Sequence, residues 1–395
     1  MRPGHDVVVV GGGPAGSAVS SLLAQRGARV LLLERARFPR PKPCAEYLSP
    51  EAGVVLERLG ALSAVERSRP ARLGGMRIVS ADGTAFTGRF GSHDGLALPR
   101  ERFDDILLRH AARAGVDVRE ETAFDRFTAE RGRLCVWSRP RGRRVPSAEC
   151  RTPLVVAADG LNSRVTAALG LGRRGRRRWL ALVTHATGVT GMTDVGEMHV
   201  TRDAYIGLAP LGDGLTNIAA VVRLDGAMPR PPAVWLERTI ARLPEVRDRV
   251  AGARFVTRVR AVGPFARTTT RATADHVLLV GDAADFYDPF TGEGIYAALR
   301  GAELAADRVT AALATGRFRR AALAGYDDDR LRAFGGKWIV ERLIGLATAR
   351  PALLDHVAHR LARRPDLADV LVRVTGDLAP PSRMLRPSFL WRLVA

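Results

Sequence analysis

The sequence has few cysteines, no long apolar run and almost no lysine. Its three cysteines, Cys44, Cys135 and Cys150, form neither a C-x-x-C pair nor the even set of a disulfide framework, which excludes a disulfide-stapled secreted scaffold. No apolar run approaches the ~20 residues that a membrane-spanning helix needs. The first residues lack the charged-then-apolar pattern of a secretory signal. We therefore expect a cytoplasmic protein whose thiols are reduced.

The charge is strongly positive, but its source is unusual. The chain has 61 Lys+Arg and 41 Asp+Glu, a formal net charge of +20, yet only Lys42 and Lys337 are lysines. Arginine in place of lysine, with abundant alanine, is what a GC-rich genome would produce. The clusters Arg131–Arg144 and Arg173–Arg178 alternate with Gly and Pro and lack the interleaved aromatic residues that stack on bases. We interpret both as solvated loops and expect no nucleic-acid partner, while contact with an anionic cofactor or a membrane surface stays open.

The apolar content is high enough for a large core. The 395 residues are 46% hydrophobic and 26% charged, a composition that excludes disordered and collagen-like classes. The length suggests roughly two or three domain-sized units.

The clearest motif lies near the N-terminus. A β-branched run over residues 6–10 leads directly into Gly11-x-Gly13-x-x-Gly16. A helix-compatible stretch and a second apolar strand follow, and the strand ends at Glu34. This order is typical of a dinucleotide-binding βαβ unit, in which the glycines allow a tight turn, close approach of a pyrophosphate and close packing of the helix. The glycine pattern alone does not distinguish FAD from NAD.

Later segments repeat the pattern of a buried strand that ends in a polar turn. A helix is predicted from Arg100, a strand precedes Asp159-Gly160, and another strand precedes Gly281-Asp282. A long Ala-rich helix is predicted from about Gly294.

With these motifs in this order, residues 5–315 resemble the FAD-binding scaffold of the p-hydroxybenzoate hydroxylase-like flavoproteins. Two stretches, FPRPKPCAEYLSP (residues 38–50) and DPFTGEGIYAALRG (residues 288–301), are similar to the geranylgeranyl reductase branch. The resemblance implies an α/β (α+β) fold: a Rossmann-like FAD-binding domain, a mainly antiparallel substrate sheet and a helical C-terminus.

We expect a discontinuous FAD-binding domain of residues 1–175 and 263–335, a substrate-binding sheet of residues 176–262 and a helical segment of residues 336–395. The apolar, basic tail PSFLWRLVA (residues 387–395) could dock on the body, line the substrate entrance or touch a membrane, and docking is our expectation. Within the substrate sheet, strand-like runs lie at residues 180–187, 205–209 and 217–223.

The resemblance assigns FAD contacts to these motifs. Glu34 would accept hydrogen bonds from the ribose of the AMP half, Arg100 would contact the phosphate or ribityl region, and Asp282 would bind a ribityl hydroxyl, with a helix-capping role able to coexist. The expected cofactor-binding residues are Gly11, Gly13, Pro14, Ala15, Gly16, Glu34, Arg35, Arg100, Ala123, Asp159, Gly160, Gly281, Asp282, Gly292, Gly294 and Ile295.

Two of these sites concern electron supply. Backbone N–H groups from Gly292 to Ile295 would face the flavin edge where the negative charge of the reduced form collects. Asp159-Gly160 resembles a motif that some members use for both FAD and nicotinamide pyrophosphates. Because the chain has no second G-x-G-x-x-G, NADH or NADPH would bind transiently in a cleft, or a partner protein would reduce the flavin.

Lys42-Pro43-Cys44 lies in a Pro-rich loop and supplies the candidate catalytic residues. In the reductase branch this cysteine faces the substrate beside the flavin, which makes Cys44 a candidate proton donor. Because lysine is rare in this chain, Lys42 indicates that this position requires an ammonium group rather than a guanidinium. A cysteine that merely packs in the loop is equally consistent. The branch continues Cys-Gly-Gly or Cys-Gly-Glu where this chain has Ala45-Glu46, so its backbone is less free.

The substrate motif also departs from the branch. Isoprenoid reductases carry Tyr-x-Trp-x-Phe-Pro, whereas this chain keeps Tyr205 and Pro210 but has Gly207 and Ala209 in place of the two large aromatics. The loss of two rings would enlarge or reshape a pocket that we expect to be lined by Tyr205, Gly207, Ala209 and Pro289. A bulky fused or branched apolar substrate fits this better than a long polyprenyl chain.

Three functions follow. The first is an FAD-dependent monooxygenase, a hydroxylase or epoxidase that uses NAD(P)H and O₂ to tailor a bulky hydrophobic metabolite such as a polyketide or terpenoid, and the altered aromatic motif favours it. The second is an ene-reductase in which Cys44 gives the proton. The third is a flavin-binding protein without turnover. The histidines form no metal-ligand pattern, so we expect no metal, and a homodimer stays open.

Overall fold

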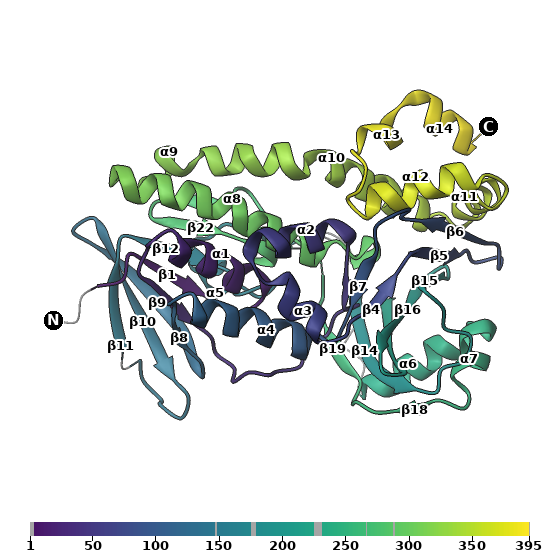
Figure 1. Ribbon diagram of the computed structural model, residues 1–395, viewed down its shortest axis with the longest axis horizontal. Helices are drawn as coiled ribbons and strands as arrows, with labels where there is room; N and C mark the ends of the chain where they lie inside the picture. The colour runs from purple at the N-terminus through teal and green to yellow at the C-terminus, as the bar shows by residue number, and fades with distance from the viewer. Residues whose placement is uncertain are drawn as a thin grey trace.

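A computed structural model (Figure 1) describes residues 4–146, 148–174, 179–224, 231–265, 267–286 and 289–394. One unit is built on a six-stranded sheet in the order β21-β22-β12-β1-β2-β8. β1 pairs in parallel with β2 and β12, and its four valines are buried on both faces, which confirms the expected Rossmann-like sheet. Its strands are β1 (Val7–Val10), β2 (Val30–Leu33), β8 (Asp117–Arg119), β12 (Leu154–Ala157), β21 (Thr273–Ala274) and β22 (Val277–Leu279).

Helices cover this sheet. α1 follows the glycine turn and packs against both α4 and α8. α8 begins at Gly294, where the sequence predicts the long Ala-rich helix, and α4 begins at Arg100. The helices of this unit are α1 (Pro14–Gln25), α2 (Pro50–Leu59), α3 (Leu62–Arg67), α4 (Arg100–Arg113), α5 (Arg164–Ala168), α8 (Gly294–Thr315) and α9 (Arg320–Leu323), with 3-10 turns η1 (Gly281–Ala283) and η2 (Pro289–Thr291).

The prediction of a loop over Arg131–Arg144 is wrong. Residues 133–140 form β10, the central strand of a three-stranded antiparallel sheet. Leu134 and Val136 are buried while most of the flanking arginines are exposed, so a strand with arginine at its ends resembles a solvated loop in composition. Most of the cluster Arg173–Arg178 lies outside the described residues. The three strands are β9 (Thr122–Glu130), β10 (Arg133–Pro140) and β11 (Ala148–Thr152).

A second sheet of eight strands is mainly antiparallel, as expected for the substrate domain. The runs predicted at residues 180–187, 205–209 and 217–223 lie in β14, β16 and β17. The sheet extends beyond residues 176–262, because β5 and β6 join it through a parallel pairing of β5 with β15. Its strands are β5 (Gly75–Val79), β6 (Ala85–Arg89), β14 (Trp179–Thr187), β15 (Val195–Val200), β16 (Ala204–Gly212), β17 (Leu215–Arg223), β18 (Arg254–Phe255) and β19 (Arg260–Val262).

The two faces of this sheet have different neighbours. Ile206 and Leu208 pack against the helices α6 (Pro232–Ala241) and α7 (Pro244–Val250). Because successive strand residues point to opposite faces, Tyr205 and its alternate neighbours face the other side. Short pairings complete the chain path between the units: β3 (Tyr47–Leu48), β4 (Ala71–Leu73) and β7 (Gly95–Ala97), and β13 (Gly172–Arg174) with β20 (Arg267–Thr269).

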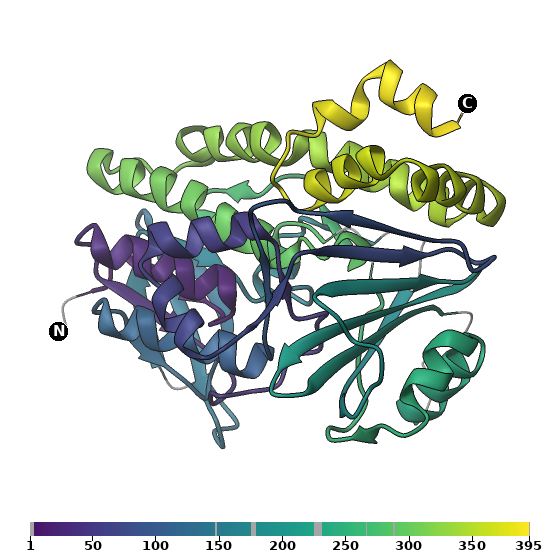
Figure 2. The ribbon, with the colours of Figure 1, turned by 45° about the vertical axis from the view of Figure 1, so that its right-hand side comes forward.

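The C-terminal segment is helical, as expected, and α11 and α12 lie across β6 (Figure 2). α10 begins at Gly325, so the expected boundary at residue 336 falls inside a helix. In the tail, Phe389 is buried and Trp391 is 70% exposed. Within the described part of the chain, every helix is too short or too polar to cross a membrane. The helices are α10 (Gly325–Thr348), α11 (Pro351–Arg363), α12 (Pro365–Thr375), α13 (Ser382–Leu385) and α14 (Pro387–Val394).

Candidate cofactor and substrate site

The glycine turn between β1 and α1 forms a cradle. Gly11 has a φ of +101°, and a Cβ atom there would lie 2.5 Å from the carbonyl oxygen of Ala158. A Cβ atom on Gly16 would overlap the carbonyl oxygen of Gly11. A Cβ atom on Gly13, by contrast, would have only Arg40 Nη2 nearby, at 3.9 Å. The helix start also has no acidic residue in its first turn, so its amides can receive an anion, and the residues fit the pyrophosphate of FAD.

Glu34 closes this turn from the next strand. Its Oε2 accepts a hydrogen bond from Gly12 N at 2.7 Å, its Oε1 accepts one from Ala36 N at 2.8 Å, and the residue is 5% exposed. An ionised carboxylate keeps further lone pairs on these oxygens, which suits the expected ribose hydroxyls. Arg35 is exposed beside it, and Thr122 N donates to Glu34 O at 2.7 Å, which brings β9 and Ala123 to the same end of the sheet.

Asp159 has one oxygen engaged and one without a partner among the described residues. Its Oδ2 accepts from Arg164 N at 2.7 Å at the start of α5, and its Oδ1 is buried without a hydrogen bond. Burial raises the pKa of this carboxyl above its usual range. Gly160 follows with a φ of +77°. A buried oxygen of this kind needs a hydrogen-bond partner, and a cofactor hydroxyl would provide one.

Gly281 and Gly292 bring two further segments to the cradle. A Cβ atom on Gly281 (φ +61°) would lie 3.0 Å from the Ala15 methyl, so η1 packs directly on α1. A Cβ atom on Gly292 (φ +72°) would lie 2.9 Å from the Tyr47 ring. Gly294 opens α8 with free space around it and Ile295 is buried behind it, so backbone amides are exposed at this helix start.

Arg100 and Cys44 lie close enough in the candidate site to interact electrostatically. Arg100 Nε and Nη2 donate to the two carboxylate oxygens of Asp104 at 2.7 and 3.0 Å, and the guanidinium lies within electrostatic range of Cys44. Burial alone would lower the pKa of Arg100, but the charge of Asp104 outweighs it and raises that pKa, so the guanidinium stays protonated. Asp104 is fully buried, which fixes this geometry.

Lys42 and Asp282 lie within electrostatic range of the same group. Burial lowers the pKa of Lys42, and the charge of Asp282 opposes that effect. Burial likewise raises the pKa of Asp282, with Lys42 and Arg100 opposing. The structure therefore brings together residues that the sequence places in three distant segments, and it adds Arg40, which the sequence analysis missed. Arg40 Nη1 lies 3.0 Å from Asp104 Oδ2, and Arg40 is the nearest side chain to the open side of Gly13.

Glu46, His185 and Asn217 are further site residues that the sequence analysis missed. His185 Nε2 lies 2.7 Å from Glu46 Oε2, and Asn217 Nδ2 donates to the same oxygen at 2.9 Å and to Cys44 O at 3.0 Å. These side chains connect the substrate sheet to the Cys44 loop. A cavity of ≈ 80 Å³ borders them, and its polar lining includes Lys42, Glu46, His185, Thr257, Arg258 and Arg260.

The expected substrate residues share one face of β16. Tyr205 is 8% exposed and its ring meets Phe290 edge-on, with centroids 5.1 Å apart. A Cβ atom on Gly207 would meet only backbone and side-chain atoms of the sheet itself, at 3.7 Å or more, so a larger side chain would fit there sterically. Ala209 pairs with Asn217 in register, which places it next to the Cys44 loop. The backbone of Pro289 lies in η2, and its side chain is outside the described part of the structure.

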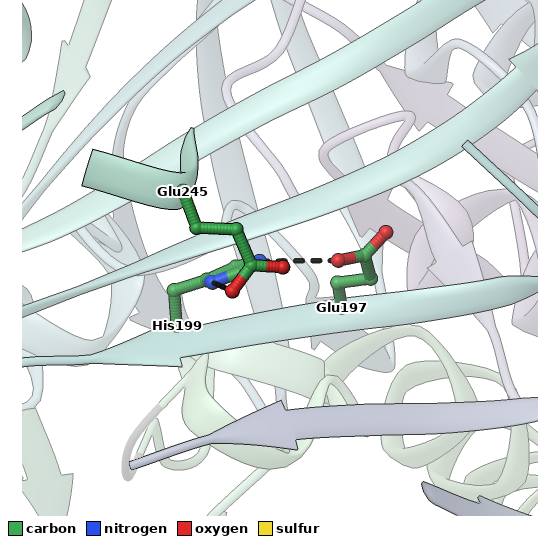
Figure 3. A group of neighbouring side chains, drawn as sticks. All are labelled: Glu197, His199 and Glu245. Carbon is green, nitrogen blue, oxygen red and sulfur yellow. Dashed lines mark hydrogen bonds and ion pairs between the residues drawn. The ribbon is translucent and has the colours of Figure 1, made fainter. Parts of the chain in front are cut away.

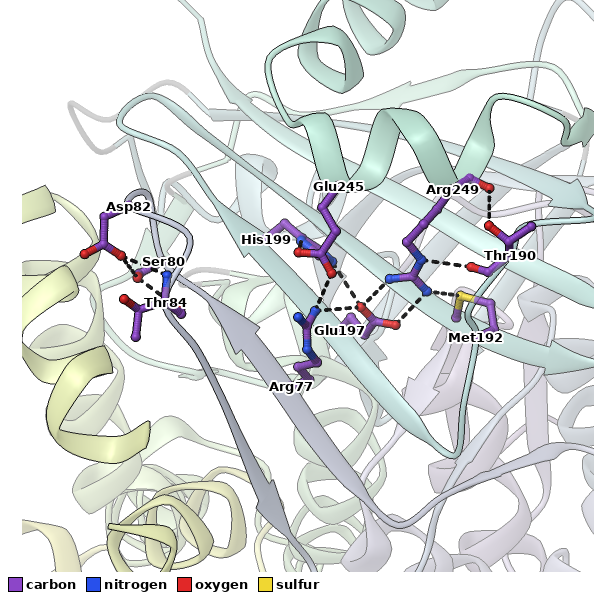
Figure 4. A network of polar contacts seen from close by, with 10 residues as sticks. All are labelled: Arg77, Ser80, Asp82, Thr84, Thr190, Met192, Glu197, His199, Glu245 and Arg249. Atoms are coloured by element: carbon purple, nitrogen blue, oxygen red, sulfur yellow. Dashed lines mark hydrogen bonds and ion pairs between the residues drawn. The ribbon is translucent and has the colours of Figure 1, made fainter. Parts of the chain in front are cut away.

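The other face of the substrate sheet carries a separate polar cluster, Glu197, His199 and Glu245, whose spacing is compatible with metal ligands (Figure 3). Arg249 donates to both oxygens of Glu197 at 2.6 and 2.8 Å, and Arg77 lies 3.3 Å away (Figure 4). Burial alone would raise the pKa of Glu197, but the hydrogen bonds from His199 and Arg249 outweigh it and lower that pKa to about 2. Two guanidinium groups already neutralise this carboxylate, so we interpret the cluster as an ion-pair network that ties α7 to the sheet.

Comparison with known proteins agrees with this geometry. A family described as FAD binding domain matches residues 4–336. The chain belongs to this FAD binding domain family. It is an FAD-dependent oxidoreductase by family, and the residues of the cradle fit FAD.

Among its relatives, a digeranylgeranylglycerophospholipid reductase of Methanoculleus marisnigri is 29% identical over 83% of this chain and 82% of that protein. The conditioned medium factor receptor 1 of Dictyostelium discoideum is 26% identical over 97% of this chain and 79% of that protein. The geranylgeranyl reductase resemblance is thus confirmed at the level of the family branch.

Solved structures show the same fold. The myxobacterial chondrochloren halogenase CndH matches with a TM-score of 0.77 and 28% identity over 85% of this chain and 81% of that one. The flavin-dependent halogenase CmlS matches with a TM-score of 0.76 and 24% identity, and this chain spans 63% of its length. Members of one fold therefore reduce or halogenate different substrates, so the activity has to be argued from the site.

Proposed function

We propose that this FAD-dependent oxidoreductase reduces a carbon–carbon double bond in a bulky apolar substrate, with Cys44 as the proton donor. The observation that supports this most is that the Arg100 guanidinium, which Asp104 fixes by two hydrogen bonds, lies within electrostatic range of Cys44. The relatives named as digeranylgeranylglycerophospholipid reductases agree with this choice.

Reduction of the double bond requires a hydride at one carbon and a proton at the other. FAD in its reduced form supplies the hydride when bound, and NADH or NADPH is the reductant that we infer for it. The proton leaves the Cys44 sulfur, and the S–H bond breaks as the C–H bond forms. The negative charge that develops on sulfur is stabilised by the Arg100 guanidinium.

The substrate class follows from the face that contains Tyr205. This strip runs from Tyr205 to Ala209, about 13 Å along the strand at ~3.3 Å per residue, and ends beside Asn217 and the Cys44 loop. Its apolar surroundings include Phe265 and Phe290. We infer that an apolar polyketide or terpenoid lies along it with its double bond near Cys44.

Oxygenation is the second candidate. Gly207 and Ala209 stand where isoprenoid reductases carry two large aromatics, and this difference in the sequence favours a monooxygenase. A monooxygenase would not need an acid at Cys44, so the charge of Arg100 near Cys44 and the relatives named as reductases make reduction the better-supported of the two.

The experiment is turnover of the FAD-loaded protein, supplied with NADH or NADPH, on a panel of polyketide and terpenoid alkenes, under argon and under ¹⁸O₂, with mass detection of products. Reduction predicts a product that gains two hydrogens under argon, a large loss of this activity in Cys44→Ala, and no loss in Cys150→Ser, a half-buried cysteine far along the chain. An ¹⁸O-labelled product that forms only with oxygen would overturn the proposal in favour of the monooxygenase. Rapid reduction of the flavin with no change in any substrate would favour a binding role.

A further inference from the structure

Glu46 accepts hydrogen bonds from three separate elements. Arg100 N donates to Oε1 at 2.8 Å, while His185 Nε2 and Asn217 Nδ2 reach Oε2 at 2.7 and 2.9 Å. Because an ionised carboxylate only accepts, the His185 nitrogen is the donor in its contact. Glu46 is 3% exposed, so these bonds form away from bulk water, where a missing partner is costly.

The two sheet residues are register partners. His185 on β14 lies opposite Asn217 on β17, and both are on the face that contains Tyr205. Asn217 Nδ2 also donates to Cys44 O. Asn217 therefore holds the backbone of Cys44 directly. Through Glu46, His185 and Asn217 also hold the backbone of Arg100.

The backbone of Glu46 supports this interpretation. Its φ is +61°, a left-handed conformation that a residue with a side chain rarely adopts. Such a conformation persists where the surroundings determine it, and functional sites are where it is commonly found. Here the three hydrogen bonds to the carboxylate and the bond from Leu98 N to Glu46 O at 3.2 Å determine it.

We propose that Glu46, held by His185 and Asn217, is a positioning residue that keeps the Cys44 loop beside the start of α4, where Arg100 lies. The substrate sheet thereby sets the position of the acid that acts on the substrate lying along it. The expected effect of Glu46 on turnover rests on the proposed function. Its expected effect on the position of the Cys44 loop does not.

The test compares His185→Ala with His185→Gln in the FAD-loaded protein. The alanine variant removes the donor to Glu46, and the glutamine variant keeps an amide donor. We expect His185→Ala to lower kcat about ten- to hundredfold with little change in KM, since a small displacement of a reacting group has that effect. His185→Gln should recover most of the loss, and His93→Ala, at an exposed histidine, should match the wild type.

Hydrogen exchange gives a second readout that does not depend on activity. In His185→Ala, the amides of residues 44–48 should exchange at least about tenfold faster, while the amides of β1 and β2 keep their wild-type rates, because the loop loses a charged hydrogen bond. Unchanged exchange in these amides would overturn the proposal. Faster exchange in a protein that reduces no alkene would leave the positioning role intact and overturn the proposed function alone.

Discussion

Lys337 is one of only two lysines in the chain, and its ammonium group lies among acidic side chains. It forms ion pairs with Asp377 and with Glu293, the latter at 3.3 Å, and it sits 4.2 Å from the ring centre of Tyr296. Burial lowers the pKa of Lys337 and raises the pKa of Glu293, and in each case the partner's charge opposes the shift. This group joins the start of α8, beside the expected flavin, to the C-terminal helices.

We predict that Lys337→Met lowers the free energy of unfolding by about 3–5 kcal/mol, because it leaves two buried carboxylates without their cation. Urea unfolding measures this. Arg342→Met is the matched control, since Arg342 is exposed on the same helix and its loss should change stability little. Equal unfolding free energies for the two variants would show that the buried group contributes nothing specific.

Glu197 gives the protein a defined acid sensitivity. Its pKa is about 2 in the folded chain against 4.5 for the ordinary carboxyl, so its contribution is complete above pH 4.5 and is lost as the pH falls toward 2. The difference corresponds to about 3 kcal/mol. We predict that Glu197→Gln is less stable than the wild type at pH 7 by about this amount and that the gap narrows between pH 5 and pH 3. Unfolding curves at these pH values measure the gap, and a gap independent of pH would contradict the assignment.

At the scale of elements, the local sequence pattern predicts some helices, strands and strand pairings and misses others. The β1–α1–β2 unit is predictable because strand period, glycine turn and terminal acid all lie within 30 residues, and each has a separate physical signature. The strand β10 is missed because six arginines lie within residues 131–144, while only Leu134 and its apolar neighbours mark the buried face. The joining of β5 to β15 is invisible locally, since the pairing spans more than a hundred residues.

The residues of the candidate site likewise fall into those that a local motif predicts and those that it does not. Gly11, Glu34 and Asp282 are found from motifs that each sit at the end of one strand. Glu46 and His185 are not, because 139 residues separate them and neither lies in a motif. The only local signal was that Glu46 follows Cys44 where the branch also allows an acid.

The helix start at Gly16 offers an element-scale prediction. In Gly16→Ala the new Cβ atom would overlap the carbonyl oxygen of Gly11, so α1 must move away from β1. We expect the variant to lose about 1–3 kcal/mol of stability and to be purified with little FAD. Gly53→Ala in α2, which has open space around it, should be neutral or stabilising by up to ~1 kcal/mol. Flavin absorbance and urea unfolding report both effects, and full flavin content in Gly16→Ala would refute the role given to this glycine.

At the scale of the whole molecule, the C-terminal helices pack as part of the unit built on the eight-stranded sheet. α12 and α11 lie on β6, an edge strand of the eight-stranded sheet, and they share a buried cluster with Phe86 of that strand. Covering an edge in this way prevents it from pairing with other chains. The C-terminal segment is therefore bound to the substrate sheet through β6 and to the cofactor unit through Lys337.

Gly88 is the point where this packing is closest. A Cβ atom there would lie 2.4 Å from the carbonyl oxygen of Ala368 and 2.5 Å from Val372 Cγ2, so α12 rests directly on the strand backbone. We predict that Gly88→Val displaces α12, lowers the free energy of unfolding by about 1–3 kcal/mol and makes the C-terminal segment sensitive to limited proteolysis, while FAD stays bound because the six-stranded sheet is untouched. Thr87→Val places an apolar group on the exposed side of the same strand. This variant should leave both the free energy of unfolding and the protease resistance of the C-terminal segment unchanged. A layer of helices that stabilises the sheet cannot be lost without lowering the free energy of unfolding. If protease released the C-terminal segment from Gly88→Val while the free energy of unfolding stayed the same, these helices would therefore be an appendage rather than part of the core.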